Sequence, residues 1–290
     1  AVERRVMRSL SGEKEPGQVA GWLIWHPDVR RMVLAQKAIG EGGRAMIYST
    51  AQLADKMFTA VLVGNQQQYE EFDSQLGFFT PILKGFLTEM GLEAANLGMQ
   101  VYGGHGYIQE HGMEQIARDA RISTLYEGTT GIQALDLLGR KVMVGTRGKC
   151  VRDFTAEVMR FAKPHALSRG PLGKMARSLI WRSLQWNLLT TRLMMRSAKD
   201  RDQVGASSVD YLMYSGYVMM GYHWALQAAK ASELLGSGAG QAPEEFYRTK
   251  IHTAEFYFAR LLPRADAHQR LAMASTKSLL QIDKAHMQID

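Results

Sequence analysis

The sequence predicts an all-α protein, on the strength of three observations. Only 7 of the 290 residues are proline and 17 are methionine, so helix breakers are few and straight-chain helix formers are plentiful. Apolar residues recur at helical spacing through most of the chain. No stretch of useful length alternates apolar and polar residues as a half-buried strand does. The hydrophobic core is therefore expected to come from packed helices.

The amino-terminal half is predicted to contain a long helix that begins at His26-Pro27-Asp28. Proline suits the first helical position, and an acidic residue suits a helix N-terminus. Apolar residues then recur at helical spacing from Val29 to Val61. The glycines Gly40, Gly42 and Gly43 interrupt this pattern. We expect them to permit close packing between helices rather than to end the helix.

A polar connection is predicted over residues 64–73, and a second helix is expected after it. Thr80 and Pro81 are expected to open that helix as its N-cap and first helical residue. The least helical stretch of the chain follows at residues 103–107, which read Gly-Gly-His-Gly-Tyr. A third helix is expected to begin near Thr129 or Thr130, whose hydroxyl groups can cap it.

The carboxy-terminal half is predicted to form a further helical domain. Glycines and polar residues from Gly145 to Cys150 are typical of a hinge, and the apolar pattern becomes helical again beyond them. We therefore divide the chain into domains at 1–150 and 151–290. The second domain is expected to hold four helical blocks: Val151–Ala162, Leu172–Lys199, Ser208–Leu235 and Pro243–Ile289, the last broken at Pro263.

The charge and the cysteine content exclude several function classes. A formal net charge of +7 indicates an anionic partner, and nucleic acid, a membrane surface or a phosphate-bearing cofactor would each suit it. The basic residues are scattered and form no tight run interleaved with aromatic residues, so nucleic-acid binding is not expected. A single cysteine, Cys150, excludes an internal disulfide, a Cys-rich zinc site and an iron–sulfur cluster. With no targeting signal at its start, the chain is expected in a reducing, cytoplasmic setting.

The segment from Tyr211 to Ala229 is the nearest approach to a membrane span, because it has no Asp, Glu, Lys or Arg. It includes four tyrosines, His223 and Gln227, which makes it too polar for a span. We therefore expect no transmembrane segment and interpret these residues as a helix buried inside a bundle.

Two features of residues 103–111 are candidates for ligand binding. His105 and His111 have acidic neighbours, but their spacing matches no helical pair of metal ligands, so no metal is predicted. The glycines of residues 103–106 lack the spacing and the preceding strand of a dinucleotide-binding fingerprint. They indicate a tight turn where the backbone closely approaches another group. That group is either a neighbouring helix or a ligand.

Residues 126–131, Tyr-Glu-Gly-Thr-Thr-Gly, place a carboxylate before glycines and hydroxyl groups at the entrance to an apolar helix. In the simpler interpretation, Glu127 favours the helix N-terminal dipole and Thr129 caps the helix. In the functional interpretation, Glu127 is a general base in an apolar pocket and Gly128 leaves room for a substrate. Position alone favours the simpler interpretation.

The whole run from Gln100 to Gln133 decides otherwise, because it strongly resembles the carboxy-terminal signature of acyl-CoA dehydrogenases. It contains Gln-x-x-Gly-Gly-x-Gly, then Arg-Asp-Ala-Arg-Ile, then Tyr-Glu-Gly-Thr, with the family's internal spacing. The resemblance extends back to His-Pro-Asp-Val-Arg-Arg-Met at residues 26–32 and forward through Gly-Arg-Lys at residues 139–141. The tail resembles the extra helical domain of a long bacterial subgroup that includes the methylthiopropanoyl-CoA dehydrogenases.

The resemblance implies a flavoenzyme chemistry in which an acyl-CoA thioester loses its α-proton to a base and its β-hydrogen as hydride to FAD. Glu127 matches the position of the catalytic base, and a desolvated pocket would raise the proton affinity of such a carboxylate. Gly128 matches a position that lies against the substrate. The implied flavin contacts are Thr129, Thr130 and Gly131 from one subunit and Gln100, Val101, Tyr102, Gly103 and Gly104 from its neighbour.

The resemblance also carries departures and further expectations. Arg4 loosely matches an arginine that meets the partner's FAD pyrophosphate, and Gly131 stands where the family often has glutamine. The family's amino-terminal helical domain and middle β-domain are expected to be missing from this chain. A homodimer or higher homo-oligomer, an electron-transfer flavoprotein as acceptor, and a role in fatty acid β-oxidation are implied. The rival hypothesis is a non-catalytic helical module that dimerises or docks a partner and retains the ancestral motif.

Overall fold

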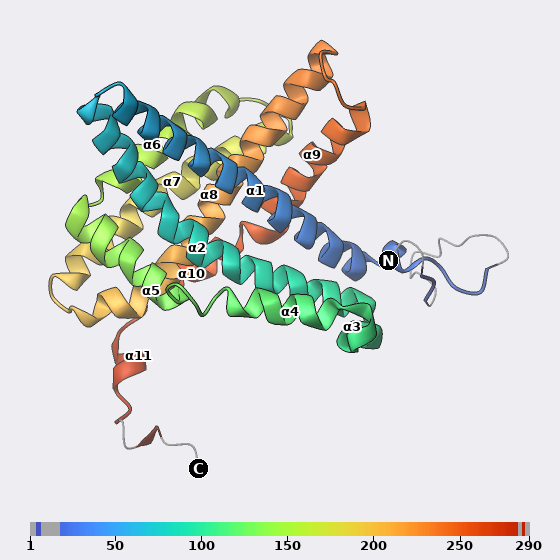
Figure 1. Cartoon of the computed structure of the whole chain (residues 1–290), viewed down its shortest axis with the longest axis horizontal. Helices are drawn as coiled ribbons and strands as arrows, with labels where there is room; N and C mark the ends of the chain where they lie inside the picture. The colour runs from blue at the N-terminus through green and yellow to red at the C-terminus, as the bar shows by residue number, and fades with distance from the viewer. Residues whose placement is uncertain (1–3, 7–17, 284–285, 288–290) are drawn as a thin grey trace. The chain divides into compact units, whose positions relative to one another are not determined.

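The computed structural model describes residues 4–6, 18–283 and 286–287, and in this part of the chain the fold is helical (Figure 1). The one β feature among these residues is an isolated antiparallel bridge between Arg5 and Trp22. The predicted all-α class is confirmed. The chain divides into two compact units, which are described in turn: unit 1 comprises Ala1–Glu41 and Thr88–Tyr126, and unit 2 comprises Gly42–Leu87 and Glu127–Asp290.

Two long helices contribute residues to both units. Helix α1 spans Pro27–Leu62, and helix α2 spans Gln66–Tyr102. The predicted start of the first helix at Pro27 is confirmed. The predicted connection at 64–73 is too long, because a turn at residues 63–65 is followed at once by α2.

The prediction that Thr80 and Pro81 open a helix is wrong, because Pro81 lies inside α2. An internal proline costs a helix about 3 kcal/mol through the lost hydrogen bond and the steric clash. Phe78, Ile82 and Phe86 on the same helix are each at most 2% exposed. Burying each such side chain contributes about 1.5–3 kcal/mol, so tertiary packing outweighs the proline.

Unit 1 also contains short helices that precede α1 or follow α2 in the sequence. A 3-10 turn at Leu23–Trp25 precedes α1. After α2 come α3 (Gly104–Tyr107), a 3-10 turn at Gln109–His111 and α4 (Met113–Ile122). Residues 103–107, expected to be the least helical in the chain, therefore include one helical turn after a left-handed residue at Gly103.

Unit 2 holds the remaining helices. Thr129 caps α5 (Thr130–Leu135) as expected, and a π-helix at Asp136–Gly145 continues it. The four predicted blocks correspond to α6 (Lys149–His165), α7 (Pro171–Ser197), α8 (Asp202–Ser237) and a broken final stretch. That stretch consists of α9 (Glu244–Phe256), a π-helical turn at Tyr257–Leu261, α10 (Arg264–Ala272) and α11 (Lys277–Leu280).

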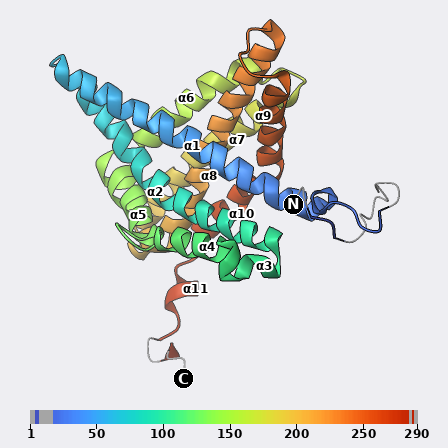
Figure 2. The same cartoon turned by 45° about the vertical axis from the view of Figure 1, so that its right-hand side comes forward.

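Helix α8 is the centre of unit 2. It contacts α5, α7, α9 and α10, and Figure 2 shows it running among helices α7, α9 and α10. Every residue from Tyr211 to Ala225 is buried. A helix that is apolar on all sides belongs in the core of a bundle, as the sequence predicted for this segment. Within the described residues, no helix has the length and apolar character needed to cross a bilayer.

Glycines allow close helix packing around α8. A Cβ atom added to Gly42 of α1 would lie 2.6 Å from the indole nitrogen of Trp224 and 2.8 Å from a carbon of Met220. A Cβ added to Gly216 of α8 would overlap the ring of Phe86 from α2. The expectation that a glycine of α1 serves packing is confirmed for Gly42.

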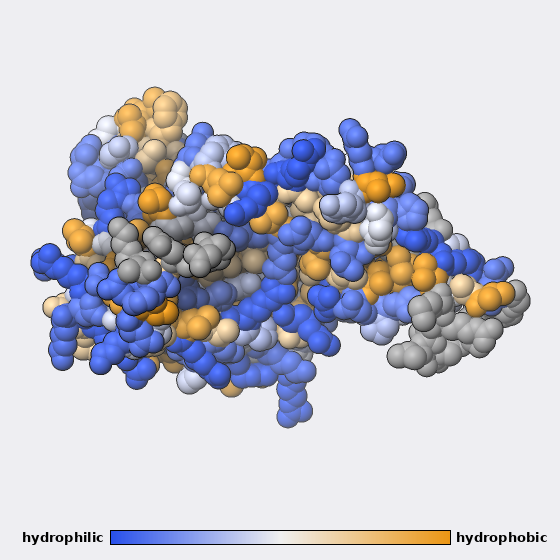
Figure 3. Space-filling model, turned by 90° about the horizontal axis from the view of Figure 1, so that it is seen from below, coloured by the Kyte–Doolittle hydropathy of each residue, from blue (hydrophilic) through white to orange (hydrophobic). Residues whose placement is uncertain are grey.

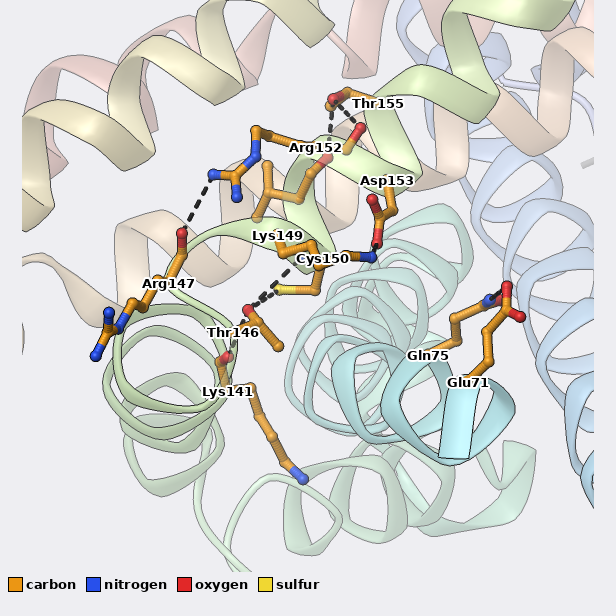
Figure 4. A network of polar contacts seen from close by, with 11 residues as sticks. Glu71, Gln75, Lys141, Thr146, Arg147, Lys149, Cys150, Arg152, Asp153 and Thr155 are labelled. Carbon is orange, nitrogen blue, oxygen red and sulfur yellow. Dashed lines mark hydrogen bonds and ion pairs between the residues drawn. The ribbon is translucent and has the colours of Figure 1, made fainter. Parts of the chain in front are cut away.

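The predicted hinge at Gly145–Cys150 is a compact turn between the π-helix and α6. Arg147 and Gly148 are left-handed, with φ of 48° and 76°. The Thr146 hydroxyl donates to the Lys141 carbonyl at 2.9 Å and lies 3.0 Å from the Cys150 sulfur (Figure 4). Burial raises the pKa of the Cys150 thiol, which keeps it protonated at neutral pH.

The face shown in Figure 3 is mostly hydrophilic, with hydrophobic residues in scattered groups between hydrophilic ones. The exposed large apolar side chains include a group at the end of α1 and the following turn: Phe58, Val61, Leu62 and Val63.

Candidate active site

Glu127, the first residue of the second segment of unit 2, has a backbone conformation that its side chain disfavours. Its φ is 52° and that of Gly128 is 93°, so two consecutive residues adopt positive φ. A non-glycine residue in the left-handed region costs about 1–2 kcal/mol, because Cβ approaches the following carbonyl oxygen. Residues held in such conformations cluster at functional sites. Glu127 shares this conformation with Arg147, so the strain is in keeping with a functional role for Glu127 without singling it out.

A side chain at Gly128 would crowd Gln133 as well as strain the backbone. A Cβ atom at Gly128 would lie 2.5 Å from the side-chain nitrogen of Gln133. That nitrogen donates a hydrogen bond to the Glu127 carbonyl oxygen at 3.3 Å. Gln133 therefore helps to hold the strained turn, a role that sequence reasoning missed although the motif ends on this residue.

Thr129 connects the turn to α5. It is the N-cap, and its hydroxyl accepts a hydrogen bond from the Ile132 backbone N–H at 3.4 Å. Thr130 and Gly131 form the first turn of α5 behind it. The residues from Glu127 to Gly131 are thus brought together by one turn and one helix start. Glu127 itself is exposed, so the described residues of unit 2 do not enclose it in the apolar pocket that the functional interpretation expected.

The second group of predicted site residues lies in unit 1. Gln100, Val101 and Tyr102 are the last residues of α2, and the Gly103 N–H donates to the Gln100 carbonyl at 3.0 Å. Gly103 has φ of 63°, which explains a glycine there. No atom lies within 4 Å of a Cβ added to Gly103 or Gly104, whereas one added to Gly106 would meet the Met99 backbone. Helix packing therefore explains Gly106 and leaves the first two glycines open to a ligand.

Arg4 joins this group across almost a hundred residues of sequence. Its guanidinium donates to the Tyr102 carbonyl at 3.0 Å. Nearby, the Arg5 guanidinium stacks 3.8 Å from the centre of the Trp22 ring, and the His26 imidazole lies 2.9 Å from the Val6 carbonyl. These contacts hold Arg4 beside the turn, so unit 1 brings together a cation and two open glycines.

The two histidines of the same segment lie close to each other. The His105 and His111 rings are 5.3 Å apart and edge to face, and His111 also lies 6.0 Å from the Tyr102 ring. In the described part of the chain, no three His, Cys, Asp or Glu side chains are grouped so that they could hold a metal ion.

Two family models match the chain, one after the other. Residues 3–143 match the acyl-CoA dehydrogenase carboxy-terminal domain, and residues 154–283 match a region described as acetyl-CoA dehydrogenase C-terminal like. Together the two matches account for most of the chain, and they include every predicted site residue.

Individual relatives agree with the family models. The 3-methylmercaptopropionyl-CoA dehydrogenase of Ruegeria pomeroyi is 37% identical over 86% of this chain and 41% of its own length. A broad-specificity linear acyl-CoA dehydrogenase of Mycobacterium tuberculosis is 31% identical over 90% of this chain and 43% of its own. Among solved structures, an acyl-CoA dehydrogenase from Bacillus anthracis complexed with FAD has the same fold, with a TM-score of 0.68 at 16% identity over 90% of this chain and 44% of that one.

The chain spans about two-fifths of the length of these curated relatives. The motif from Gln100 to Gln133, the strained turn at Glu127 and the successive matches to two carboxy-terminal regions all lead to one assignment. The chain belongs to the acyl-CoA dehydrogenase family.

Proposed function

We propose that this chain is the carboxy-terminal part of an FAD-dependent acyl-CoA dehydrogenase and that Glu127 removes the α-proton of an acyl-CoA thioester. The observation that carries the proposal is the positive φ of Glu127 inside the family motif. A carboxylate that only interacts with the helix dipole does not require a strained backbone. It has the same effect at an unstrained position in the first turn of the helix.

The open turn of unit 1 fits a phosphate-bearing cofactor. Arg4 supplies a fixed positive charge beside Tyr102, and a backbone without side chains at Gly103 and Gly104 leaves room for close approach. Bound FAD would supply the acceptor for the β-hydrogen as hydride. We assign its contacts to Arg4 and Gln100–Gly104 from one subunit, and to Thr129, Thr130 and Gly131 from another.

Glu127 works as a base through its position and its surroundings. Its carboxylate accepts the α-proton and becomes a neutral carboxylic acid, and the C–H bond electrons remain on the substrate. The exposed carboxylate needs a water-excluding environment for this step, since desolvation raises its proton affinity. We propose that the bound acyl-CoA itself provides much of that environment, with Gly128 leaving room for it.

Further parts of the proposal rest on the family resemblance. They are a homodimer or higher homo-oligomer, an electron-transfer flavoprotein as acceptor, a role in fatty acid β-oxidation, and a cytoplasmic location for a chain with one free thiol. We also propose that the chain consists of domains 1–150 and 151–290. The exposure of Glu127 favours a second candidate for the isolated chain, a non-catalytic helical module that retains the motif.

One pair of measurements tests the proposal. In the full-length enzyme, we expect Glu127→Gln to keep its flavin absorbance and to lose two to four orders of magnitude in kcat with an acyl-CoA. Glu110→Gln, an exposed glutamate of unit 1, is the control and should retain activity. Activity of Glu127→Gln within a few-fold of the unchanged enzyme would refute the base assignment.

The isolated chain decides between the two candidates for this segment. The purified 290-residue chain is incubated with excess FAD, freed of unbound flavin and examined by visible absorption. A retained flavin band that bleaches anaerobically with an acyl-CoA would exclude the module. A folded chain without flavin would mean that this segment acts only within a larger protein.

A further inference from the structure

A cavity of about 270 Å³ lies in unit 2 between helices α1, α2, α6 and α8, and none of its lining residues belongs to the proposed flavin or substrate site. Its lining includes Thr50 and His223, each only 6% exposed. The same lining includes the exposed charged residues Lys56 and Glu157. We call the part of the lining with the buried polar residues the interior and the part with the exposed charged residues the mouth.

The buried interior contains polar groups that the core does not need. The Thr50 hydroxyl is buried and has no hydrogen-bond partner in the described part of the chain. An unsatisfied buried hydroxyl costs about 1–3 kcal/mol. Burial also lowers the pKa of His223 to about 4, so that its imidazole is neutral at pH 7 and can both donate and accept a hydrogen bond. Both groups suit a neutral polar partner.

Aromatic side chains also line the cavity. Phe154 lies edge to face with Phe79, at 5.4 Å between ring centres, and with Tyr222, at 5.7 Å. Edge-to-face and offset geometries are those in which another ring is accommodated favourably. The Tyr222 hydroxyl donates to Glu157 at 3.0 Å and so orients the carboxylate at the mouth.

The two charges at the mouth are opposite and are not paired with each other. No ion pair joins Lys56 to Glu157 among the residues that the structure describes. A single positive or negative ligand would meet one favourable and one unfavourable charge. A zwitterion would meet two favourable ones, with its ammonium on the carboxylate and its carboxylate on the lysine, and charge-assisted hydrogen bonds are the stronger kind.

We propose that this cavity binds an aromatic α-amino acid in its zwitterionic form. The charged head lies between Lys56 and Glu157, the ring lies along Phe79 and Phe154, and a polar group on the ring points toward Thr50 and His223. The proposal does not depend on the flavin site, so it is tested separately from the proposed function.

The test uses L-tyrosine as the probe and isothermal titration calorimetry on the 290-residue chain. Tyramine lacks the carboxylate, and 3-(4-hydroxyphenyl)propanoate lacks the ammonium. Because a hydrogen bond to a charged group contributes about 1.5–3 kcal/mol, each analogue should bind at least tenfold more weakly than tyrosine. L-phenylalanine, without the ring hydroxyl, should bind a few-fold more weakly. Absence of tyrosine binding, or equal binding of either analogue, overturns the proposal.

Variants locate the binding in this cavity. Lys56→Gln and Glu157→Gln should each weaken tyrosine binding at least tenfold, and both side chains are exposed, so the fold should tolerate the changes. Asp55→Asn and Glu233→Gln are matched exposed controls that do not line the cavity and should bind normally. Glu127→Gln should also bind normally, even if it abolishes dehydrogenation in the parent enzyme. Unchanged affinity in both Lys56→Gln and Glu157→Gln would refute the site.

Discussion

Arg182 of α7 and Asp266 of α10 form a two-point ion pair across 84 residues of sequence. One guanidinium nitrogen is hydrogen-bonded to Oδ1, and the other lies 2.9 Å from Oδ2. The Arg182 side chain is 9% exposed and that of Asp266 is 45% exposed. The hydrogen bonds from Arg182 lower the pKa of Asp266, so the carboxylate is held ionised. The pair fixes α10 against the bundle and neutralises a buried cation.

We expect Asp266→Asn to lower the free energy of unfolding by about 2 kcal/mol, measured by urea titration. Breaking a fully buried pair costs about 3–5 kcal/mol, and the partial exposure of Asp266 reduces this through solvent screening. Glu255→Gln on α9, an exposed side chain, is the control and should change little. An equal effect of the two substitutions would show that the ion pair contributes nothing specific.

His223 is predicted to make unit 2 sensitive to mild acid. Its pKa is about 4 when buried and about 6.5 when unfolded, so the unfolded state binds the proton first as the pH falls. The stability associated with neutral His223 is therefore complete above pH 6.5 and is lost progressively down to pH 4. The expected total is on the order of 3 kcal/mol. Urea titrations at several pH values should show this loss in the unchanged chain and a smaller one in His223→Gln, whereas the exposed His252→Gln keeps it.

Two glycines of α8 should respond oppositely to alanine. Gly216→Ala places a methyl group into the Phe86 ring and should cost about 1–3 kcal/mol through overpacking. Gly205→Ala meets no atom within 4 Å and should gain up to about 1 kcal/mol from helix propensity. Thermal unfolding by circular dichroism measures both. A destabilised Gly205→Ala would mean that the helix start is less regular than its backbone indicates.

The strained turn yields a prediction about stability rather than catalysis. Glu127→Gly should raise the free energy of unfolding by up to about 1 kcal/mol, because glycine adopts positive φ without the Cβ penalty, although it gains entropy when unfolded. Glu114→Gly, inside α4 with ordinary helical geometry, should instead destabilise the chain. Denaturant titrations of both variants separate the two effects. Destabilisation by Glu127→Gly would remove the argument from strain.

Sequence periodicity was enough to predict the helical fold, the lack of charge predicted the buried character of α8, and the proline and capping residues predicted the starts of α1 and α5. The prediction that a helix begins at Pro81 was wrong, because a local rule about proline does not take into account the burial of Phe78 and Phe86 on the same helix. Motif recognition found Glu127 but not the role of Gln133. It also could not place Arg4 beside Tyr102 or bring Thr50 and His223 into the lining of one cavity, since those arrangements depend on the tertiary fold.

The left-handed backbone of Glu127 also bears on how this protein can be engineered. A stability-guided redesign scores each position by the residue that its backbone prefers, and at position 127 that residue is glycine. Such a procedure would raise the melting temperature while deleting the proposed base. Residue 127 should therefore be held constant in any thermostabilised library. If it is varied and the library is selected for folding alone, the enrichment of glycine at this position would measure how strongly selection for turnover opposes selection for stability.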